Sequence, residues 1–523
     1  MNTVPFESGA ASAAPQRRRG GRLAKQASRS AETALSLGAI RAGLPGGAYK
    51  PLSLQDIEAI HATALEILET IGFAQAIPTG AEAMIRAGAV MGEDGRIRFP
   101  RALVEDTIAR ANRDFTLFGK IPDADIHPRG TNVHFATAGA AVHMVDLETR
   151  SYRESTLRDL YDAVRLADAL DNIHLIQRPL VARDIADTVD FDVNTAYVGL
   201  VGTRKHYGTS FSNAESVPKT LELAHMVAGG EEAWRARPFL SMSCCFVVPP
   251  LKFAEDACAA MEAAIHGGMP ILLLSAGQAG ATAPAPLAGA VAQAVAEVLG
   301  GLVYVNAVRP GHPAIFGPWP FVSDLRSGAM SGGSGEQGLL SAACAQMGQF
   351  YRLPCGSAAG MTDAKLPDMQ AGYERGMTAV MAGAAGLNIV YEAAGMYASL
   401  LGFSLDSMII DNDCLGAAMR VVRGIEVNED TLSLDTIRSV CLDGPGHYLG
   451  HTQTLAVMQT EYLYPEIGDR TSPKEWEERG RPDLLEQAIA RRKAILESHY
   501  PAHVTPDLDA RLRAAANILL PRS

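Results

Sequence analysis

The stretch AEDACAAMEAAIHGGMPILLL, residues 254–274, shows the unit from which most of this chain is built. Its first part, residues 254–266, spaces apolar side chains as an amphipathic helix does, and a pair of glycines then ends that helix. The second part, residues 270–274, is a short apolar run that begins with proline, which is typical of a strand buried on both faces. The stretch therefore predicts a helix that leads into a buried parallel strand.

Similar units recur along the chain at a spacing of about 30–45 residues. Eight short, buried strands with helices between them predict an α/β fold, a TIM-type (β/α)8 barrel. One segment leaves an alternative open, because Leu302–Asn306 can form a ninth strand or end the preceding helix, and nine strands would favour a doubly wound sheet. The predicted strands are 132–137, 173–177, 205–210, 239–244, 270–274, 314–316, 354–357 and 387–391, and helices are predicted over 156–169, 254–266, 287–299 and 336–349.

We expect the catalytic barrel domain to cover residues 126–465 and to be preceded by an α-rich region, residues 51–125. Ser53 can cap the first helix of that region, and apolar residues follow at helical spacing until Gly72 ends it. The basic residues 1–50 are predicted to be a flexible tail. They carry eight Lys or Arg and two acids, a net charge of +6, which leaves −18 for the rest of a chain whose total is −12.

The arginines of this tail could contact nucleic acid or an acidic partner, or the tail could simply be solvated. The acidic body argues against nucleic acid as the main ligand. At the other end, residues 466–523 are predicted to be a helical extension, in which Ser472 and Glu475 fit a capping box. These helices are expected to pack on the outside of the barrel or on a second subunit of a homo-oligomer.

Composition places the chain among cytoplasmic globular proteins. It has 523 residues, of which 47% are hydrophobic and 20% charged, and no run of eighteen uncharged apolar residues that would predict a membrane span. No apolar segment follows Arg17-Arg18-Arg19, so a secretory signal is not supported. Seven scattered cysteines without a C-x-x-C pair fit a reducing compartment and make a zinc site improbable.

Aromatic and acidic residues cluster where a barrel places its chemistry, just after the carboxyl ends of the strands. Aromatic rings together with carboxylates form a natural receptor for a methylated ammonium, which has no N–H to donate. The alternative is a rigid turn whose rings fill the barrel mouth. The residues in question are Phe316, Trp319, Phe321 and Tyr391, with Asp324, Asp363 and Glu392.

Two glycine-rich or charged loops lie near these residues in the sequence. Gly332, Gly333 and Gly335 precede a helix and could present backbone N–H groups to an anion, or could merely allow a tight turn. Asp363 and Lys365 flank one residue and could pair with each other or serve in the site.

A pair of histidines, His447 and His451, has the i, i+4 spacing of helical metal ligands. The glutamate of the H-E-x-x-H motif is missing and glycines surround both, so no metal is expected. Cys244 and Cys245 have no base motif beside them and are expected in the core.

At several of these loops the chain resembles the trimethylamine methyltransferase family, the corrinoid-dependent methylamine and betaine methyltransferases. The resemblance extends nearly end to end. The matching stretches are Arg17–Arg22, Ala314–Gly317, Ser323–Gly328, Thr362–Gly372, Gly446–Leu455 and Pro465–Glu478.

This resemblance implies a TIM-type barrel that transfers a methyl group from a methylated amine to Co(I) of a partner corrinoid protein, with no cofactor held tightly by this chain. Well-known archaeal members carry pyrrolysine, whereas this chain has standard residues, with the loop Asp363–Asp368 as the proposed equivalent position. The departure favours a quaternary amine such as glycine betaine over trimethylamine, because a quaternary nitrogen leaves as a neutral amine without further activation.

The resulting hypothesis assigns roles to individual residues. The catalytic candidates are Asp324, Glu392, Asp363 and Lys365, of which Glu392 or Asp324 would be the charge partner of the substrate ammonium. Phe316, Trp319 and Tyr391 would form its aromatic cage, and Arg178, His206 or Lys365 would bind a substrate carboxylate. Gly332, Gly333 and Gly335 would let the corrinoid approach the backbone. A metal-dependent barrel lyase or hydrolase using His447 and His451, and a non-catalytic betaine-binding protein, are the alternatives.

Overall fold

The computed structural model describes residues 38–444 and 446–522. The chain divides into a smaller unit, residues 1–39 with 435–462, and a larger unit, residues 40–434 with 463–523. Of the predicted basic tail, residues 1–37 lie outside the described residues, and the remainder contains the short strand β1 (Leu44–Pro45).

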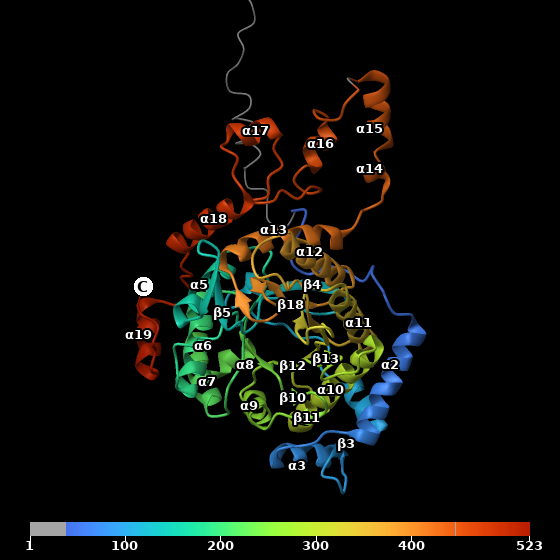
Figure 1. The fold of residues 1–523 in the computed structure, drawn as a ribbon, viewed down its shortest axis with the longest axis vertical. Coiled ribbons are helices and arrows are strands. Elements are labelled where there is room, and N and C mark those ends of the chain that lie inside the picture. The colour runs from blue at the N-terminus through green and yellow to red at the C-terminus, as the bar shows by residue number, and fades with distance from the viewer. Residues whose placement is uncertain (1–37, 445, 523) are drawn as a thin grey trace, which may run out of the picture. The chain divides into compact units, whose positions relative to one another are not determined.

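Eight parallel strands form the centre of the larger unit (Figure 1), which confirms the predicted α/β class. One sheet has the order β14–β12–β9–β8–β7 and the other contains β4–β18–β17, with β1 antiparallel to β4. Single parallel bridges, Ala136 with Leu175 and Phe316 with Cys355, link the two sheets, so each of the eight strands has a parallel neighbour on both sides. The strands are β4 (Asn132–Thr137), β7 (Ile176–Gln177), β8 (Tyr207–Thr209), β9 (Leu240–Cys244), β12 (Ile271–Ser275), β14 (Ala314–Pro318), β17 (Gly356–Ala358) and β18 (Ile389–Ala394).

Helices follow the strands in sequence and cover them, as the predicted alternation requires. The covering helices are α5 (Leu157–Asp168), α6 (Thr188–Gly202), α7 (Ser216–Ala228), α8 (Glu231–Ala236), α9 (Glu255–His266), α10 (Leu287–Val308), α11 (Gly335–Tyr351), α12 (Met369–Ala384) and α13 (Leu405–Arg423). Short strands lie in the connections: β5 (His143–Asp146), β6 (Ser151–Glu154), β10 (Val247–Val248), β11 (Lys252–Phe253), β13 (Gln278–Ala279), β15 (Phe321–Ser323), β16 (Met330–Ser331), β19 (Met396–Tyr397) and β20 (Gly402–Phe403).

Helix α10 resolves the alternative of a ninth strand. It continues through Leu302–Asn306 to Val308, so this segment is helical. It is long and apolar enough to cross a membrane by length and composition, but nearly all of its most apolar stretch is buried against its neighbours α2, α3, α4 and β14. A helix that is apolar on every side is typical of a protein core.

The N-terminal part of the larger unit contains the helices α2, α3 and α4. Ser53 caps α2 (Leu54–Glu66) in a capping box with Asp56. Gly72, at φ +64°, ends the π-helical turn η2 (Ile67–Ile71). The remaining elements of this part are α3 (Pro78–Ala87), β2 (Val90–Met91), β3 (Ile97–Arg98), α4 (Arg101–Arg110) and the 3-10 turn η3 (Pro122–Ala124).

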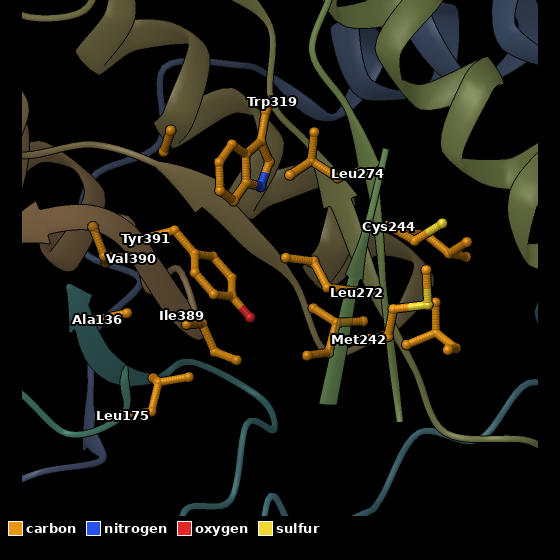
Figure 2. Close-up of a cluster of buried hydrophobic side chains, with 14 of the residues drawn as sticks. Ala136, Leu175, Met242, Cys244, Leu272, Leu274, Trp319, Ile389, Val390 and Tyr391 are labelled. Atoms are coloured by element: carbon orange, nitrogen blue, oxygen red, sulfur yellow. The ribbon is translucent and has the colours of Figure 1, made fainter. Parts of the chain in front are cut away.

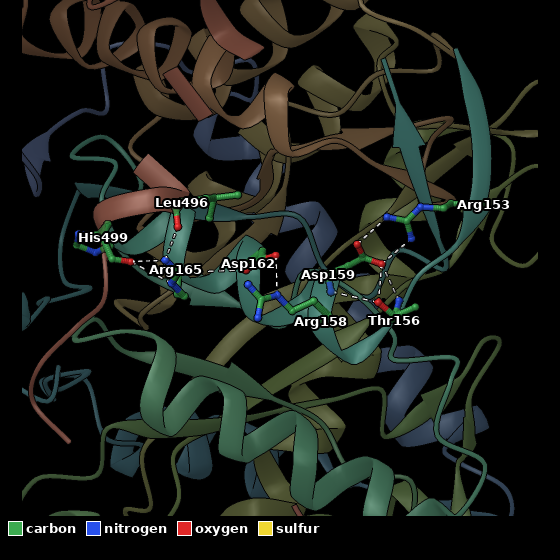
Figure 3. Close-up of polar contacts among 8 residues, drawn as sticks. All are labelled: Arg153, Thr156, Arg158, Asp159, Asp162, Arg165, Leu496 and His499. Carbon is green, nitrogen blue, oxygen red and sulfur yellow. Dashed lines mark hydrogen bonds and ion pairs between the residues drawn. The ribbon is translucent and has the colours of Figure 1, made fainter. Parts of the chain in front are cut away.

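One buried arginine helps to hold the C-terminal helix α18 (Leu484–Ser498) against α5 (Figure 3), and α18 also packs on α13. Arg165 of α5 donates to the carbonyl of Leu496 at 2.8 Å and to that of His499 at 2.7 Å, and its guanidinium stacks on Tyr500. Both carbonyls lie at or just after the end of α18, where a cation is favourable. The predicted capping box of Ser472 and Glu475 begins α17 (Pro473–Glu478), and α19 (Pro506–Ala515) follows α18.

The short helix α14 (Glu429–Leu432) precedes the smaller unit. Helix α15 (Leu434–Arg438) leads into it, and the π-helical turn η4 (Ser439–Asp443) and helix α16 (Thr452–Val457) lie within it.

Candidate active site

A β-bulge in β18 places Glu392 at the carboxyl ends of the strands. The pairing of β18 with β4 shifts register between Val390 and Ala394, and Glu392 lies in the shift with φ +66°. In a regular strand Tyr391 and Glu392 would point to opposite faces, and a bulge removes that alternation. A non-glycine residue at positive φ is strained, and such strain is concentrated at functional sites.

Glu392 is buried without a cationic partner. Its side chain is 2% exposed, and within the described residues it has one hydrogen bond, from the Gly139 N–H at 2.7 Å. Burial raises the pKa of this carboxyl to about 8, although the Gly139 N–H counteracts part of the effect. A buried carboxylate without a counter-ion is unfavourable, so a ligand cation at this position would be stabilised.

Gly139 is required for the placement of Glu392. It follows the end of β4, and a Cβ at this position would lie 2.5 Å from Oε1 of Glu392 and 3.5 Å from Cγ of Gln177. The carboxyl therefore lies where the ends of β4, β7 and β18 meet. Gly139 could not be predicted from the sequence, because no turn or phosphate motif includes it.

Arg178 supplies a positive group at the same end of the strands. It follows β7, its carbonyl accepts the N–H of Ala140, and its own N–H donates to Gly208. Its Nε has no hydrogen-bond partner within the described residues, and its guanidinium lies 5.6 Å from the centroid of Phe191. Burial lowers the pKa of Arg178, and Tyr207 and Asp192 counteract this. An arginine with an unsatisfied donor is a candidate anion receptor.

Cys245 comes directly after β9 and responds to both of these charged groups. Its surroundings raise the pKa of the thiol, Arg178 lowers that pKa and Glu392 raises it further, so both groups are within electrostatic reach. The side chain is nevertheless solvent-exposed, in contrast to the buried Cys244. The prediction of a core position is therefore correct for Cys244 and wrong for Cys245.

Two of the three proposed cage residues lie together in the interior (Figure 2). The ring centroids of Trp319 and Tyr391 are 5.2 Å apart, and Trp319 donates its Nε1–H to the carbonyl of Gly356 at 3.0 Å. Phe316 lies elsewhere: its ring packs against Tyr351 of α11, with centroids 5.5 Å apart. The structure therefore brings Trp319 and Tyr391 together without Phe316.

His206 lies at the amino ends of the strands, just before β8, and so at the opposite end from Arg178. Its Nδ1 lies 2.9 Å from the Phe118 carbonyl and its Nε2 2.9 Å from the Ser241 hydroxyl. Burial lowers the pKa of His206 to about 3. Both ring nitrogens are already hydrogen-bonded, which favours a structural role for this residue.

Asp363 connects three loops. It accepts hydrogen bonds from the Ser331 hydroxyl, from the Gly332 N–H at 2.6 Å and from the Ser399 hydroxyl at 2.7 Å. The exposed Lys365 donates to the Asp363 carbonyl and lines a cavity of about 470 Å³ with Leu147, Arg150, Asp368 and Leu485 among others. The predicted loop of Asp363 and Lys365 is thus part of a well-ordered network, in which the carboxylate is occupied by protein donors.

The predicted corrinoid contact at the glycines has little room. A Cβ at Gly332 would lie 3.0 Å from Met361, and one at Gly333 would lie 2.4 Å from Glu374, so these two glycines permit close packing of the loops. Gly335, at the start of α11, has open space in that direction. Close packing of the loops therefore accounts for the glycines at 332 and 333, and the corrinoid contact stays a prediction.

Asp324 is paired locally. It forms an ion pair with Arg326 at 2.6 Å, and the hydrogen bonds of Arg326 hold the pKa of Asp324 well below its usual range. The structure provides no contact between Asp324 and Glu392. Of the two proposed charge partners, Glu392 is the one without a protein cation.

A buried ion pair holds the segment that follows Glu392. Arg375 of α12 pairs with Asp411 of α13, and Asp411 also accepts the N–H of Gly395 at 2.7 Å. Arg375 further donates to the Met396 carbonyl. The pair thus fixes residues 395–396 from outside the strands, which restrains the bulge.

The two histidines of the predicted metal spacing are His447 and His451. In the part of the chain that the structure describes, no group of three or more His, Cys, Asp or Glu side chains could hold a metal ion. His451 instead caps α16, since its Nδ1 accepts the N–H of Gln453 at 3.2 Å.

Known proteins resemble this chain over most of its length. The family model described as trimethylamine methyltransferase (MTTB) matches residues 18–517. A trimethylamine methyltransferase, MttB, of Desulfitobacterium hafniense (strain DSM 10664 / DCB-2) is 32% identical over 461 residues, which cover 88% of this chain and 92% of that protein. A glycine betaine methyltransferase of Desulfitobacterium hafniense (strain Y51) is 31% identical over 468 residues, 89% of this chain and 96% of that protein.

Among solved structures, the monomethylamine methyltransferase MtmB of Methanosarcina barkeri matches with a TM-score of 0.41 and 16% identity. The match covers 86% of this chain and 95% of that one.

Proposed function

This chain belongs to the trimethylamine methyltransferase (MTTB) family, as its sequence motifs predicted, and we propose that it transfers a methyl group from a betaine-type quaternary amine to a corrinoid carried by a partner protein. We further infer that its eight parallel strands close into a (β/α)8 barrel. The two bridges between the sheets support closure, because they leave no free edge among the eight strands. In a closed barrel, the carboxyl ends of all eight strands would lie at the same end of the barrel.

The observation that carries the proposal is the position of Glu392 and Arg178 at the carboxyl ends of β18 and β7, the two strands on either side of β4. Glu392 lacks a cation, and Arg178 has an unsatisfied donor. A zwitterion such as glycine betaine has an ammonium for the first and a carboxylate for the second. Trimethylamine has no carboxylate and would leave Arg178 unmatched, so the betaine class fits better.

The side chains would act by holding and orienting the substrate. The Glu392 carboxylate and the Trp319 and Tyr391 rings would bind the trimethylammonium group, each ring contributing about 0.5–2 kcal/mol. Arg178 would fix the substrate carboxylate, which leaves one N-methyl group pointing away from both anchors. The corrinoid, as the methyl acceptor, supplies a nucleophilic Co(I). The rate gain of such a site comes from orientation, because a quaternary amine needs no proton to leave.

The test is transfer by the purified chain to a reduced corrinoid protein, followed through the absorbance of methyl-cobalt. We expect methyl-cobalt to form with glycine betaine and not with trimethylamine. Arg178→Lys, which keeps the charge but loses the planar donor pair, should raise the KM for glycine betaine. Transfer from trimethylamine alone, or from none of the amines, would overturn the proposal.

A further inference from the structure

Gln177 is the last residue of β7 and belongs to the same face as the aromatic pair. Side chains alternate along a strand, so Gln177 shares the face of Leu175, two residues earlier. Leu175 lies in the buried cluster that contains Trp319 and Tyr391 (Figure 2). Gln177 therefore extends this interior face toward the carboxyl ends of the strands, where Glu392 lies.

The side-chain amide of Gln177 is buried and has no protein partner. The residue is 6% exposed. Its backbone carbonyl accepts the Thr137 hydroxyl at 2.6 Å, but within the described residues its amide oxygen and nitrogen make no hydrogen bond. Neither amide atom is fully enclosed, so a small molecule can reach both. Buried polar side chains are nearly always hydrogen-bonded, which makes this amide a candidate for contact with a bound molecule.

Glycines on both neighbouring strands leave room beside this amide. Gln177 pairs with Gly208 of β8, where a Cβ would lie 2.1 Å from the amide oxygen. On the other side, a Cβ at Gly139 would lie 2.5 Å from Oε1 of Glu392 and 3.5 Å from Cγ of Gln177. The Glu392 carboxyl and the Gln177 side chain therefore flank the same glycine, with the amide toward β8.

The two groups suit the two ends of a short zwitterion. Glu392 favours an ammonium and repels a carboxylate, which therefore needs a donor away from Glu392. The amide nitrogen of Gln177 carries two N–H donors and lies toward β8. An ammonium and a carboxylate separated by one carbon match two groups that flank a single glycine.

We propose that Gln177 donates an amide N–H to the substrate carboxylate and so selects betaines over quaternary amines without a carboxylate. The inference rests on the proposed function, because it concerns the same site. Gln177 adds an uncharged, directional donor to the charge that Arg178 would supply. An analogue without a carboxylate leaves the buried amide unpaired, and a site built around a hydrogen bond rejects such analogues strongly.

The test compares two ligands that differ in the carboxylate. Glycine betaine and ethyltrimethylammonium share the trimethylammonium group, and only the first carries a carboxylate. Their affinities for the full-length chain are measured by calorimetry without a corrinoid protein. Gln177→Met keeps the length of the side chain but has no donor. In this variant the affinity for glycine betaine should fall about 10- to 100-fold, and the affinity for ethyltrimethylammonium should stay within about threefold.

Two further variants make the result specific. Gly208→Ala keeps the amide but places a Cβ 2.1 Å from its oxygen, so it should shift the amide and weaken the binding of glycine betaine alone. Gln55→Met, the same change at an exposed position of α2, should leave both affinities unchanged.

Three outcomes would contradict the role of Gln177. An equal loss of affinity for both ligands in Gln177→Met would show a structural role, and an unchanged affinity for glycine betaine would show no role in binding. Either result overturns this inference and leaves the proposed function standing. A wild-type chain that binds neither ligand would overturn the proposed function together with this inference.

Discussion

Two buried glutamates of this protein differ in what surrounds them. Glu297 of α10 accepts hydrogen bonds from the Ser275 hydroxyl, from the Leu251 N–H at 2.9 Å and from the Gln293 amide at 3.2 Å. Glu392 accepts one backbone N–H. Burial raises the pKa of both carboxyls. The difference lies in the number of donors: protein groups satisfy the Glu297 carboxylate, whereas the Glu392 carboxylate has capacity left for a further hydrogen bond or a ligand.

The backbone around Glu297 is regular, whereas the backbone around Glu392 is strained. Glu297 lies inside a regular helix, whereas Glu392 has φ +66° in a bulge that Arg375 and Asp411 restrain from outside. A buried ion pair seldom increases stability over an apolar pair of the same size. Its presence beside the bulge is consistent with the positioning of Glu392.

Glu392→Gln should cause the largest loss of function. Glutamine has the same shape and keeps an acceptor for the Gly139 N–H, but it removes the charge that would hold the ammonium. Loss of one partner of a buried charge pair costs about 3–5 kcal/mol, so kcat/KM for glycine betaine should fall by about 150- to 5,000-fold. The melting temperature at neutral pH should not fall, because the variant removes a buried carboxyl whose raised pKa destabilises the folded state there. If this variant transferred methyl groups at the wild-type rate, the assignment of Glu392 to the substrate site would be contradicted.

Gly139→Ala should displace Glu392 without altering any polar group. The new Cβ would come within 2.5 Å of Oε1, and the flexible carboxyl can move away from it. A displacement of about 1 Å costs about 100-fold in rate at an oriented site. The comparison variant is Gly376→Ala in α12, which meets open space and should transfer normally. Equal activity of the two variants would contradict the role of Gly139.

The variants Trp319→Leu and Phe316→Leu test which of these two aromatic side chains contacts the substrate. The first removes a ring that lies beside Tyr391, and the second removes a ring that packs on α11. Affinity for glycine betaine, measured calorimetrically, should fall about 10- to 30-fold for Trp319→Leu and stay unchanged for Phe316→Leu. Equal losses would show that both rings, or neither, contact the substrate.

The sequence predicted the strand positions well because their signals are local. Residues 270–274 were predicted for β12, which covers Ile271–Ser275, and the capping boxes of Ser53 and Ser472 were predicted correctly. The faces of the side chains depend on pairing register, which the sequence does not reveal. No glycine or proline marks the bulge at Glu392.

Hydrogen bonds between residues distant in the sequence could not be predicted from it either. The partner of His206 lies 88 residues away, at Phe118, and that of Asp363 lies 36 residues away, at Ser399. Both residues are of types common in active sites, so a prediction from residue type could not tell whether protein groups or substrate satisfy them.

The pH dependence of binding should distinguish Glu392 from a permanently ionised carboxylate. Its pKa of about 8 leaves the carboxyl neutral below that pH, and a quaternary cation favours the ionised form. Affinity for glycine betaine should therefore rise about tenfold per pH unit up to about pH 8 and then level off. The same shift makes the empty protein less stable as pH rises from about 4.5 to about 8, because the folded state holds the proton more tightly. In Glu392→Gln both dependences should disappear, and a constant wild-type affinity between about pH 6 and pH 9 would contradict the assignment.

Glu297→Gln should have the smallest effect on transfer and a clear effect on stability. The variant amide places an N–H₂ group among donors from Ser275, Leu251 and Gln293, so at least one buried donor loses its acceptor. An unsatisfied buried group costs about 1–3 kcal/mol, which lowers the melting temperature by a few degrees. Transfer at a temperature where the variant is folded should stay within about threefold of wild type, since Glu297 lies behind β12 and does not reach the Glu392 carboxyl. The two Glu→Gln variants should thus show opposite patterns, one losing activity and the other stability. A loss of transfer by Glu297→Gln as large as that of Glu392→Gln would show that the number of donors around a buried carboxylate does not identify the functional one.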